Sequence, residues 1–138
     1  RDHEGEELLI LFADLDHLKE INDSFGHIEG DFSIRHCAEV LKKVVGADGI
    51  VGRIGGDEFC VVTLGNLKDG QQIIERIREE SDAFNCTSDK EYYVELSAGC
   101  TSVICRNGLV IADALREADR ALYEVKKLRR NSVKKIRL

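Results

Sequence analysis

The stretch Arg53-Ile54-Gly55-Gly56-Asp57-Glu58-Phe59 separates two runs of apolar and β-branched residues. Glycine reaches positive φ without steric cost, so a Gly-Gly pair between such runs predicts a tight hairpin turn. Asp57 and Glu58 then stand at the start of the second strand, where acidic residues are normally depleted. A solvated turn would explain the two carboxylates, and so would a binding site at the mouth of the hairpin.

A second group of carboxylates follows the first predicted strand. Leu8 to Ala13 is a continuous apolar run, which is typical of a strand buried on both faces, and it leads into Asp14-Leu15-Asp16. Strand ends of this kind are where α/β-type sheets place ligands. We expect Asp16 to cap the next helix. Capping does not explain Asp14, which we expect to lie near Asp57 and Glu58 in the sheet.

The other elements are predicted from apolar spacing and from glycines and polar clusters. Helices are expected over residues 17–24, 30–45 and 69–84, with Asp69 as an N-cap, and a fourth from about 111 to the basic run at 126–130. Strands are expected around residues 50–64, from about 92 to 105, and over 133–138. This order predicts a single α+β domain over residues 1–138, with one mixed, mostly antiparallel sheet of about five strands and helices on both faces.

Composition narrows the functional class. The chain has 138 residues, 43% of them hydrophobic and 33% charged, with a net charge of −6. This balance predicts a globular domain that binds neither nucleic-acid backbones nor membranes. The five cysteines form no CxxC pair, which indicates thiols in a reducing, cytoplasmic compartment and neither a disulfide framework nor a zinc site. Because position 1 is not methionine, we expect a piece excised from a longer chain, which can itself be membrane-anchored.

The acidic residues suggest one type of chemistry. Three carboxylates in a partly buried site repel one another unless divalent cations neutralise them. Mg²⁺ accepts a few hard oxygen ligands and keeps open positions for substrate phosphates. A helix that starts beside the site adds backbone N–H donors for the same phosphates. These parts suit metal-assisted attack of a hydroxyl group on the α-phosphate of a nucleotide.

Four motifs carry a specific resemblance. They are DLDHLKEIND (residues 14–23), FGHIEGD (25–31), RIGGDEF (53–59) and ADRALYEVKKLRRN (118–131). In their order and spacing, the chain resembles the GGDEF domain of bacterial diguanylate cyclases from Leu9 to Asn131. The resemblance implies a palm-like sheet as in nucleotide cyclases and polymerases. It also implies two Mg²⁺ ions per active site (or Mn²⁺ in their place), and condensation of two GTP molecules to cyclic di-GMP and pyrophosphate. A head-to-head homodimer would present one GTP per subunit, under the control of an upstream sensory or regulatory domain.

The same resemblance assigns catalytic and metal-binding roles by motif position. Asp14, the carbonyl of Leu15, Asp57 and Glu58 would hold the metal ions. Asp57 would also accept the proton of the ribose 3′-hydroxyl, with Glu58 beside it. Lys19 would stabilise charge on the phosphates in the transition state.

Substrate-binding roles follow in the same way. Asn22 and Asp31 would read guanine, because an amide and a carboxylate suit its N1–H and N2 amino group. His27 would line the substrate pocket, and Lys126 and Arg130 would clamp phosphate. A plainer interpretation stays open for three of these assignments: His27 as a turn residue, Asn22 as a helix end, and Lys126 with Arg130 as a solvated helix terminus.

Two departures from the family pattern bear on function. Gly46 and Gly49 stand where many members carry the Arg and Asp of an R-x-x-D product-inhibition site. Glycine has no side chain to bind a ligand, so we predict that this feedback site is absent. The D-x-L-T segment that precedes the first strand in the family is also missing from this chain.

Two alternative functions remain. One is a non-catalytic GTP-binding module that regulates or docks a neighbouring domain, although such members usually lose signature carboxylates that this chain retains. The other is a cyclase with a different nucleotide choice. Asp31 argues against it, because a carboxylate repels the N1 acceptor of adenine.

Overall fold

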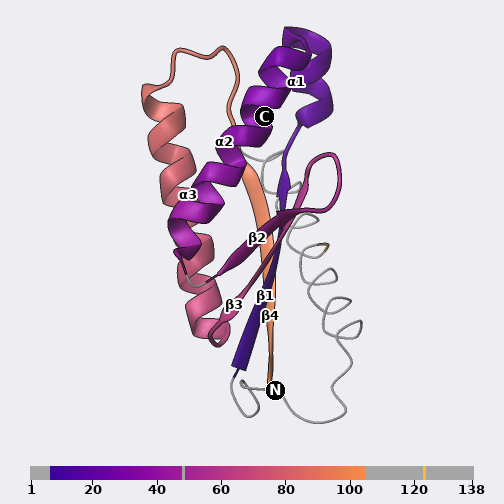
Figure 1. Ribbon diagram of the computed structural model, residues 1–138. Coiled ribbons are helices and arrows are strands. Elements are labelled where there is room, and N and C mark those ends of the chain that lie inside the picture. Colours follow the sequence, from indigo (N-terminus) through magenta and orange to yellow (C-terminus); the bar gives the residue numbers. More distant parts are fainter. Residues whose placement is uncertain (1–6, 48, 105–122, 124–138) are drawn as a thin grey trace.

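The computed structural model describes residues 7–47, 49–104 and 123 (Figure 1). Strands and helices follow in the order β1 (Glu7–Leu15), α1 (Leu18–Phe25), α2 (His27–Val45), β2 (Ile50–Arg53), β3 (Glu58–Leu64), α3 (Leu67–Thr87) and β4 (Leu96–Ile104). The α+β class is confirmed.

The sheet has β1 at its centre. The strand order is β2-β3-β1-β4, and each of the three neighbouring pairs is antiparallel. The predicted mixed sheet of about five strands is therefore an antiparallel sheet of four within the described residues. The strand predicted over residues 133–138 lies outside them. As predicted, β1 is buried on both faces, and this places its C-terminal end inside the domain.

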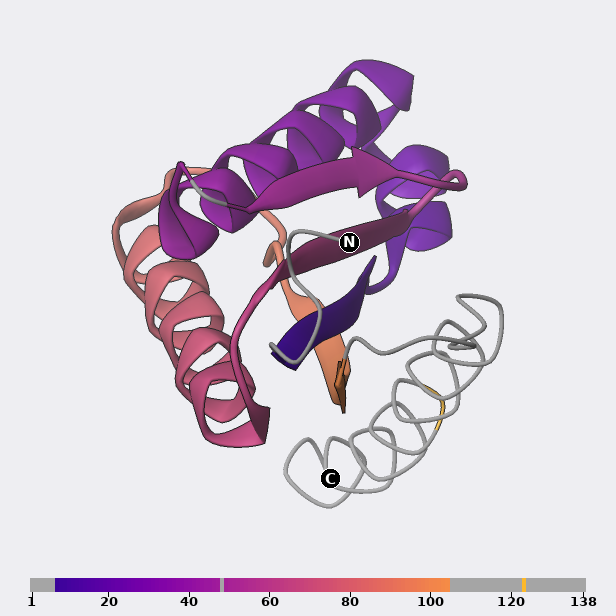
Figure 2. The same ribbon diagram turned by 60° about the horizontal axis from the view of Figure 1, so that its bottom comes forward.

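Helices α2 and α3 cover one face of the sheet (Figure 2). The alternation of side chains along β1 points Leu11, Ala13 and Leu15 toward these helices. The core between sheet and helices consists of Leu11, Ala13, Leu15, Cys37, Val40, Leu41, Val44, Phe59, Val61, Ile77, Val94, Leu96 and Ala98. The fourth helix that would cover the other face lies outside the described residues, except for Tyr123, which is helical.

Glycine allows α3 to approach the sheet closely. A Cβ atom at Gly70 would lie 2.6 Å from Sγ of Cys100 and 2.8 Å from Cδ1 of Leu9. No side chain fits at this position without displacing its neighbours. The packing of α3 on β1 and β4 therefore depends on the absence of a side chain at residue 70.

Several predicted boundaries are displaced. Helix α2 begins at His27 and not at residue 30, because Gly26 (φ 93°) ends α1 and directly precedes α2. Helix α3 is capped by Asn66, whose side chain accepts from the Asp69 N–H while the Asp69 carboxylate accepts from the Asn66 N–H. The prediction of Asp69 as the N-cap was wrong, since Asp69 is the other half of a capping box. Helix α3 also runs on to Thr87, and β4 begins only at Leu96.

The described cysteines differ in burial: Cys37 is buried, Cys60 and Cys100 are partly buried, and Cys86 is exposed. Cys37, Cys60, Cys86 and Cys100 are all free thiols. Burial raises the pKa of Cys37 to about 12, which leaves it unreactive at neutral pH. Among the described helices, none has the length and apolar character needed to cross a bilayer.

Candidate active site

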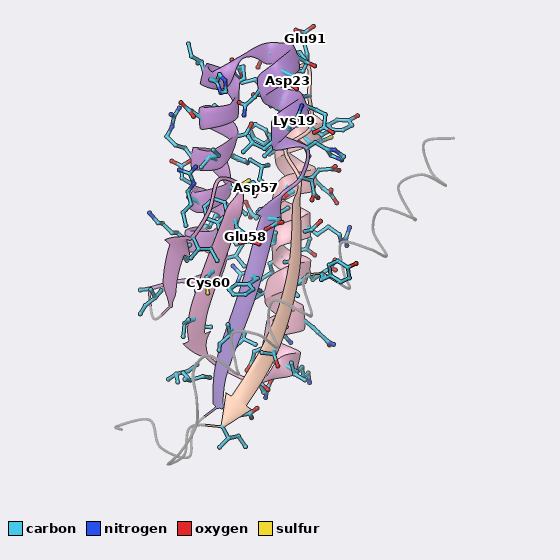
Figure 3. The ribbon with its side chains drawn as sticks, turned by 90° about the vertical axis from the view of Figure 1, so that its right-hand side faces the viewer. Lys19, Asp23, Asp57, Glu58, Cys60 and Glu91 are labelled. Atoms are coloured by element: carbon cyan, nitrogen blue, oxygen red, sulfur yellow. The ribbon has the colours of Figure 1, made fainter. Side chains whose placement is uncertain are left out.

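The end of β1 and the start of β3 bring the predicted acidic residues together. Asp14 stands directly opposite Glu58 in the antiparallel ladder, and the N–H of Leu15 donates to the carbonyl of Asp57 over 2.8 Å. Asp14 is only 5% exposed, whereas Asp57 and Glu58 are half-buried. Figure 3 shows Asp57 and Glu58 near the end of β3 that adjoins the helical tip of the domain. The predicted proximity of the three residues is therefore found at the level of the backbone.

Ser97 on β4 is a neighbour that the sequence did not reveal. Residues directly opposite one another in a sheet point to the same face. Asp14 is opposite both Glu58 and Ser97, so all three share the face turned away from α2 and α3. The buried Ser97 hydroxyl donates to both carboxylate oxygens of Asp16, over 2.9 and 2.8 Å. It thereby fastens the turn after β1 to β4.

The turn between β1 and α1 differs from the expectation. The N-cap position belongs to His17 and not to Asp16, which instead donates its N–H to the carbonyl of Glu95 and accepts from Ser97. His17 adopts φ 62° and ψ 28°, a left-handed conformation that is uncommon for residues other than glycine. Strained backbone of this kind concentrates at functional sites. The strain here lies directly after the predicted metal-binding strand end.

The hairpin is confirmed, but its turn is built differently. Four residues, 54–57, join β2 to β3, and neither Gly55 nor Gly56 has positive φ. The guanidinium of Arg53 closes the loop: Nε donates to the carbonyls of Gly55 and Gly56 over 3.1 Å each, and Nη2 donates to Gly56 over 2.9 Å. The loop is thus held by the side chain of Arg53, the first residue of the RIGGDEF motif. Arg53 was not among the predicted site residues.

The acidic residues fit a metal that is held partly by its substrate. In the portions of the chain that are described, no group of three or more His, Cys, Asp or Glu side chains is arranged to hold a metal ion. The donors at the end of β1 and in the hairpin are nevertheless hard carboxylate oxygens. Mg²⁺ typically takes one or two such carboxylates and completes its shell with waters and substrate phosphates. This donor set suits that mode of binding and not a complete protein cage.

Lys19 lies on α1, above the strand ends (Figure 3). Its side chain is 85% exposed and its Nζ lies 2.8 Å from Oδ2 of Asp23, one helical turn away. The hydrogen bond to Asp23 raises the pKa of Lys19, so the amine stays protonated. An exposed ion pair of this kind is readily exchanged for another anion.

The predicted guanine readers come together at the junction of α1 and α2. The side chain of Asn22 occupies the space beside Gly30, where an added Cβ would lie 1.8 Å from its Oδ1. Asp31 is exposed and follows Gly30 directly. His27 is the exposed first residue of α2. Asn22 thus lies against the same turn of α2 that carries Asp31.

Another group in this region was not predicted. The carboxylate of Glu29, in the first turn of α2, contacts Tyr92 and Lys90 from the segment between α3 and β4. Hydrogen bonding by Tyr92, followed by Lys90, lowers the pKa of Glu29. Burial, followed by the bond to Glu29, raises the pKa of Tyr92 to about 12. No local pattern connects positions 63 residues apart, so this contact was beyond reach of the sequence.

The remaining predicted positions are less informative. Lys126 and Arg130 lie outside the described residues. Gly46 has φ 86°, and a Cβ at Gly49 would lie 2.1 Å from Cγ1 of Val45. The connection between α2 and β2 therefore has a backbone conformation at residue 46 and close packing at residue 49 that disfavour side chains.

Comparisons with known proteins identify the family of the chain. The family model described as "Diguanylate cyclase, GGDEF domain" matches residues 1–132. Diguanylate cyclase DgcP of Escherichia coli (strain K12) is 38% identical over 128 residues, which are 91% of this chain and 37% of that protein. The chain spans 20–43% of the length of the first curated relatives that it matches.

Two solved structures extend the comparison. The active GGEEF domain of a diguanylate cyclase from Vibrio cholerae superposes with a TM-score of 0.79 at 30% identity, covering 88% of this chain and 78% of that one. The GGDEF domain of DgcB from Caulobacter crescentus, in complex with c-di-GMP, gives a TM-score of 0.78 at 27% identity, with coverages of 89% and 74%. The chain belongs to the GGDEF family of diguanylate cyclase domains.

Proposed function

We propose that this domain is a diguanylate cyclase, which condenses two GTP molecules to cyclic di-GMP and releases pyrophosphate. The supporting observation is the register of β1 against β3. It sets Asp14 opposite Glu58 and lets the Leu15 N–H donate to the Asp57 carbonyl, and α1, which carries Asn22, follows β1 directly along the chain. Metal-dependent nucleotidyl transfer needs carboxylates that bind the metal and, near them, groups that recognise the base of the nucleotide.

Asp14, the carbonyl of Leu15, Asp57 and Glu58 would hold divalent metal, with Mg²⁺ as the proposed ion and Mn²⁺ as a substitute. Bound there, the metal would act as a Lewis acid on the phosphates and favour ionisation of the ribose 3′-hydroxyl. Asp57 is the proposed acceptor of that proton. Arg53 holds the backbone of the loop just before Asp57, which supports this role because a general base must be positioned within reach of the proton.

Asn22 and Asp31 are the proposed guanine readers, with His27 beside them. Lys19 would leave Asp23 and move to the phosphates when GTP binds, because a triphosphate carries more negative charge than one carboxylate. Lys126 and Arg130 are the proposed clamp on the same phosphates.

A second copy of the domain would serve this chemistry. Cyclic di-GMP contains two equivalent phosphodiester bonds, so each GTP supplies both a 3′-hydroxyl and an α-phosphate. Two active sites that face each other, one GTP in each, satisfy this need. We propose a homodimer as the catalytic form and an upstream domain as its control.

The test is incubation with GTP and Mg²⁺ at high protein concentration, followed by chromatographic analysis of the product. Cyclic di-GMP should form. No cyclic dinucleotide should form when the metal is chelated or when ATP replaces GTP. Binding of GTP without turnover, even when the domain is fused to a dimerising segment, would favour the non-catalytic docking module.

A further inference from the structure

Three side chains from distant parts of the chain meet at the first turn of α2. The Tyr92 hydroxyl donates to Oε1 of Glu29 over 2.5 Å, and Nζ of Lys90 lies 3.0 Å from the same oxygen. The side chains of Glu29 and Lys90 are 29% and 30% exposed, so water competes for this ion pair less than for a typical surface pair. We call Glu29, Lys90 and Tyr92 the Glu29 latch.

Ring contacts extend the latch to both helices. The ring of Tyr92 lies 5.1 Å from that of Phe25, the last residue of α1. Nζ of Lys90 stands 4.5 Å from the ring centre of Phe32 on α2. The segment between α3 and β4 therefore holds α1 and α2 at once.

This tether bears on the position of α1, to which Leu18 and the buried Ile21 also contribute. Among the helices and strands, α1 packs chiefly on α2, and both extend beyond the strand ends (Figure 1). The single residue Gly26, with φ 93°, joins them, and a Cβ there would meet no atom within 4 Å. Within the described residues, this helical tip packs on α2 and through Leu18 and Ile21, and the Glu29 latch adds a polar contact from the segment between α3 and β4.

The latch lies next to the proposed guanine readers. Glu29 immediately precedes Gly30, whose backbone is in close contact with the Asn22 amide, and Asp31 comes next. A displacement of this turn by an ångström would change the separation of Asn22 and Asp31. Two hydrogen bonds to one base edge do not tolerate such a change.

We propose that Tyr92 is a positioning residue for guanine recognition, which acts through Glu29 and does not itself contact the nucleotide. The proposal rests on the function proposed above. The latch leaves Asp14, Asp57 and Glu58 untouched, because Asp14 and Glu58 belong to the sheet and Asp57 to the hairpin loop. Loss of the latch should therefore weaken base recognition and spare the chemical step.

The experiment compares Tyr92→Phe, which removes only the hydroxyl, with Tyr93→Phe as a matched control. Tyr93 is the next residue, is 64% exposed, and is not part of the latch. KM and kcat are measured for GTP, and equilibrium Kd values for 3′-deoxy-GTP and 3′-deoxy-ITP. Neither analogue has the nucleophile, and the inosine analogue lacks the 2-amino group of guanine.

Tyr92→Phe should raise KM for GTP by about three- to tenfold, as expected for one lost hydrogen bond, and change kcat less than about twofold. It should also narrow the preference for 3′-deoxy-GTP over 3′-deoxy-ITP. Tyr93→Phe should match the parent in both respects. Glu29→Ala should reproduce the Tyr92→Phe effect. Glu29→Gln keeps an acceptor for the Tyr92 hydroxyl and should restore most of the parental KM and nucleotide preference.

A Tyr92→Phe variant that melts at a lower temperature but keeps the parental nucleotide preference would overturn the proposal and leave a structural role only. If Tyr92→Phe does not fold, the comparison of Glu29→Ala with Glu29→Gln decides the question in the same way. A parent domain that neither binds 3′-deoxy-GTP nor turns over GTP would overturn the proposed function, and the latch proposal with it. A parent that does both, with identical behaviour of Tyr92→Phe and Tyr93→Phe, would overturn the latch proposal alone.

Discussion

Replacing Gly30 by alanine tests the contact between the two halves of the proposed guanine site. The added Cβ would lie 1.8 Å from Oδ1 and 2.8 Å from Cγ of Asn22. Non-bonded heavy atoms approach to about 3.5 Å, so the Asn22 oxygen has to move by roughly 1.7 Å. Asn22 is half-buried, and its amide can rotate away from α2. The movement would take it from the place where it is proposed to meet the base.

The substitution should affect the stability of the domain and its binding of GTP differently. Alanine is favoured over glycine inside a helix by up to about 1 kcal/mol, which offsets part of the crowding, so the free energy of unfolding should change by no more than about 1 kcal/mol. Loss of a paired base contact weakens binding by about 1–3 kcal/mol, which is about 5- to 150-fold in Kd. The Gly30→Ala domain should therefore fold normally and bind GTP poorly.

The assay is titration calorimetry with 3′-deoxy-GTP and Mg²⁺, together with urea unfolding of the same samples. Gly52→Ala on β2 is the control, because a Cβ there meets no atom within 4 Å. Binding by Gly30→Ala within twofold of the parent would refute the reasoning. A parallel loss of binding and stability would also refute it, because the contact would then serve the fold and not the ligand.

Three further predictions concern the chemistry, the packing and the pH dependence. Asp57→Ala should abolish cyclic di-GMP formation without unfolding the domain. Asp57→Glu, which reproduces the GGEEF sequence of the V. cholerae domain, should retain activity, and product formation by Asp57→Ala would contradict the assignment. Gly70→Ala should lower the free energy of unfolding by about 1–3 kcal/mol in urea, because its Cβ would lie 2.6 Å from Sγ of Cys100; an unchanged urea midpoint would speak against it. Burial lowers the pKa of His36 below its ordinary value of 6.5, so the unfolded chain binds this proton more readily than the folded one. This contribution to the free energy of unfolding is complete above pH 6.5 and is lost as the pH falls below it. His36→Phe should therefore lose less of its free energy of unfolding between pH 7.5 and 5.5 in urea titrations than the parent does. Equal losses in parent and variant would contradict this prediction.

Local patterns predicted the parts of the fold that depend on local forces. The apolar run of β1 and the apolar stripe of α2 were identified because each follows from burial of a strand or a helix face. The start of α2 was missed because Ile28, in its first turn, is 81% exposed and does not continue the stripe. Asp69 was assigned to the wrong position of its cap, since a carboxylate suits both the N-cap and the third residue after it.

The candidate site divides in the same way. The motifs named the residues that would meet the substrate, and the register of β1 with β3 brings Asp14 and Glu58 opposite each other. The residues that support them were not predicted. Ser97 and Tyr92 act across long separations in the chain, and only the sheet register and the packing of the α3–β4 segment reveal their partners.

The central position of β1 gives the two halves of the site different local stabilities. The buried Leu15 amide, bonded to Asp57 at the end of the central strand β1, should exchange its hydrogen with solvent more slowly than the amides of the helical tip. Among the described elements, the helical tip around Gly26 packs chiefly on α2 and on the Glu29 latch, so we expect it to open at a lower free energy than the sheet. A nucleotide would then meet a phosphate-binding half that is already rigid and a base-binding half that becomes ordered around it. The free-energy cost of this ordering would reduce the binding free energy that recognition of the base provides.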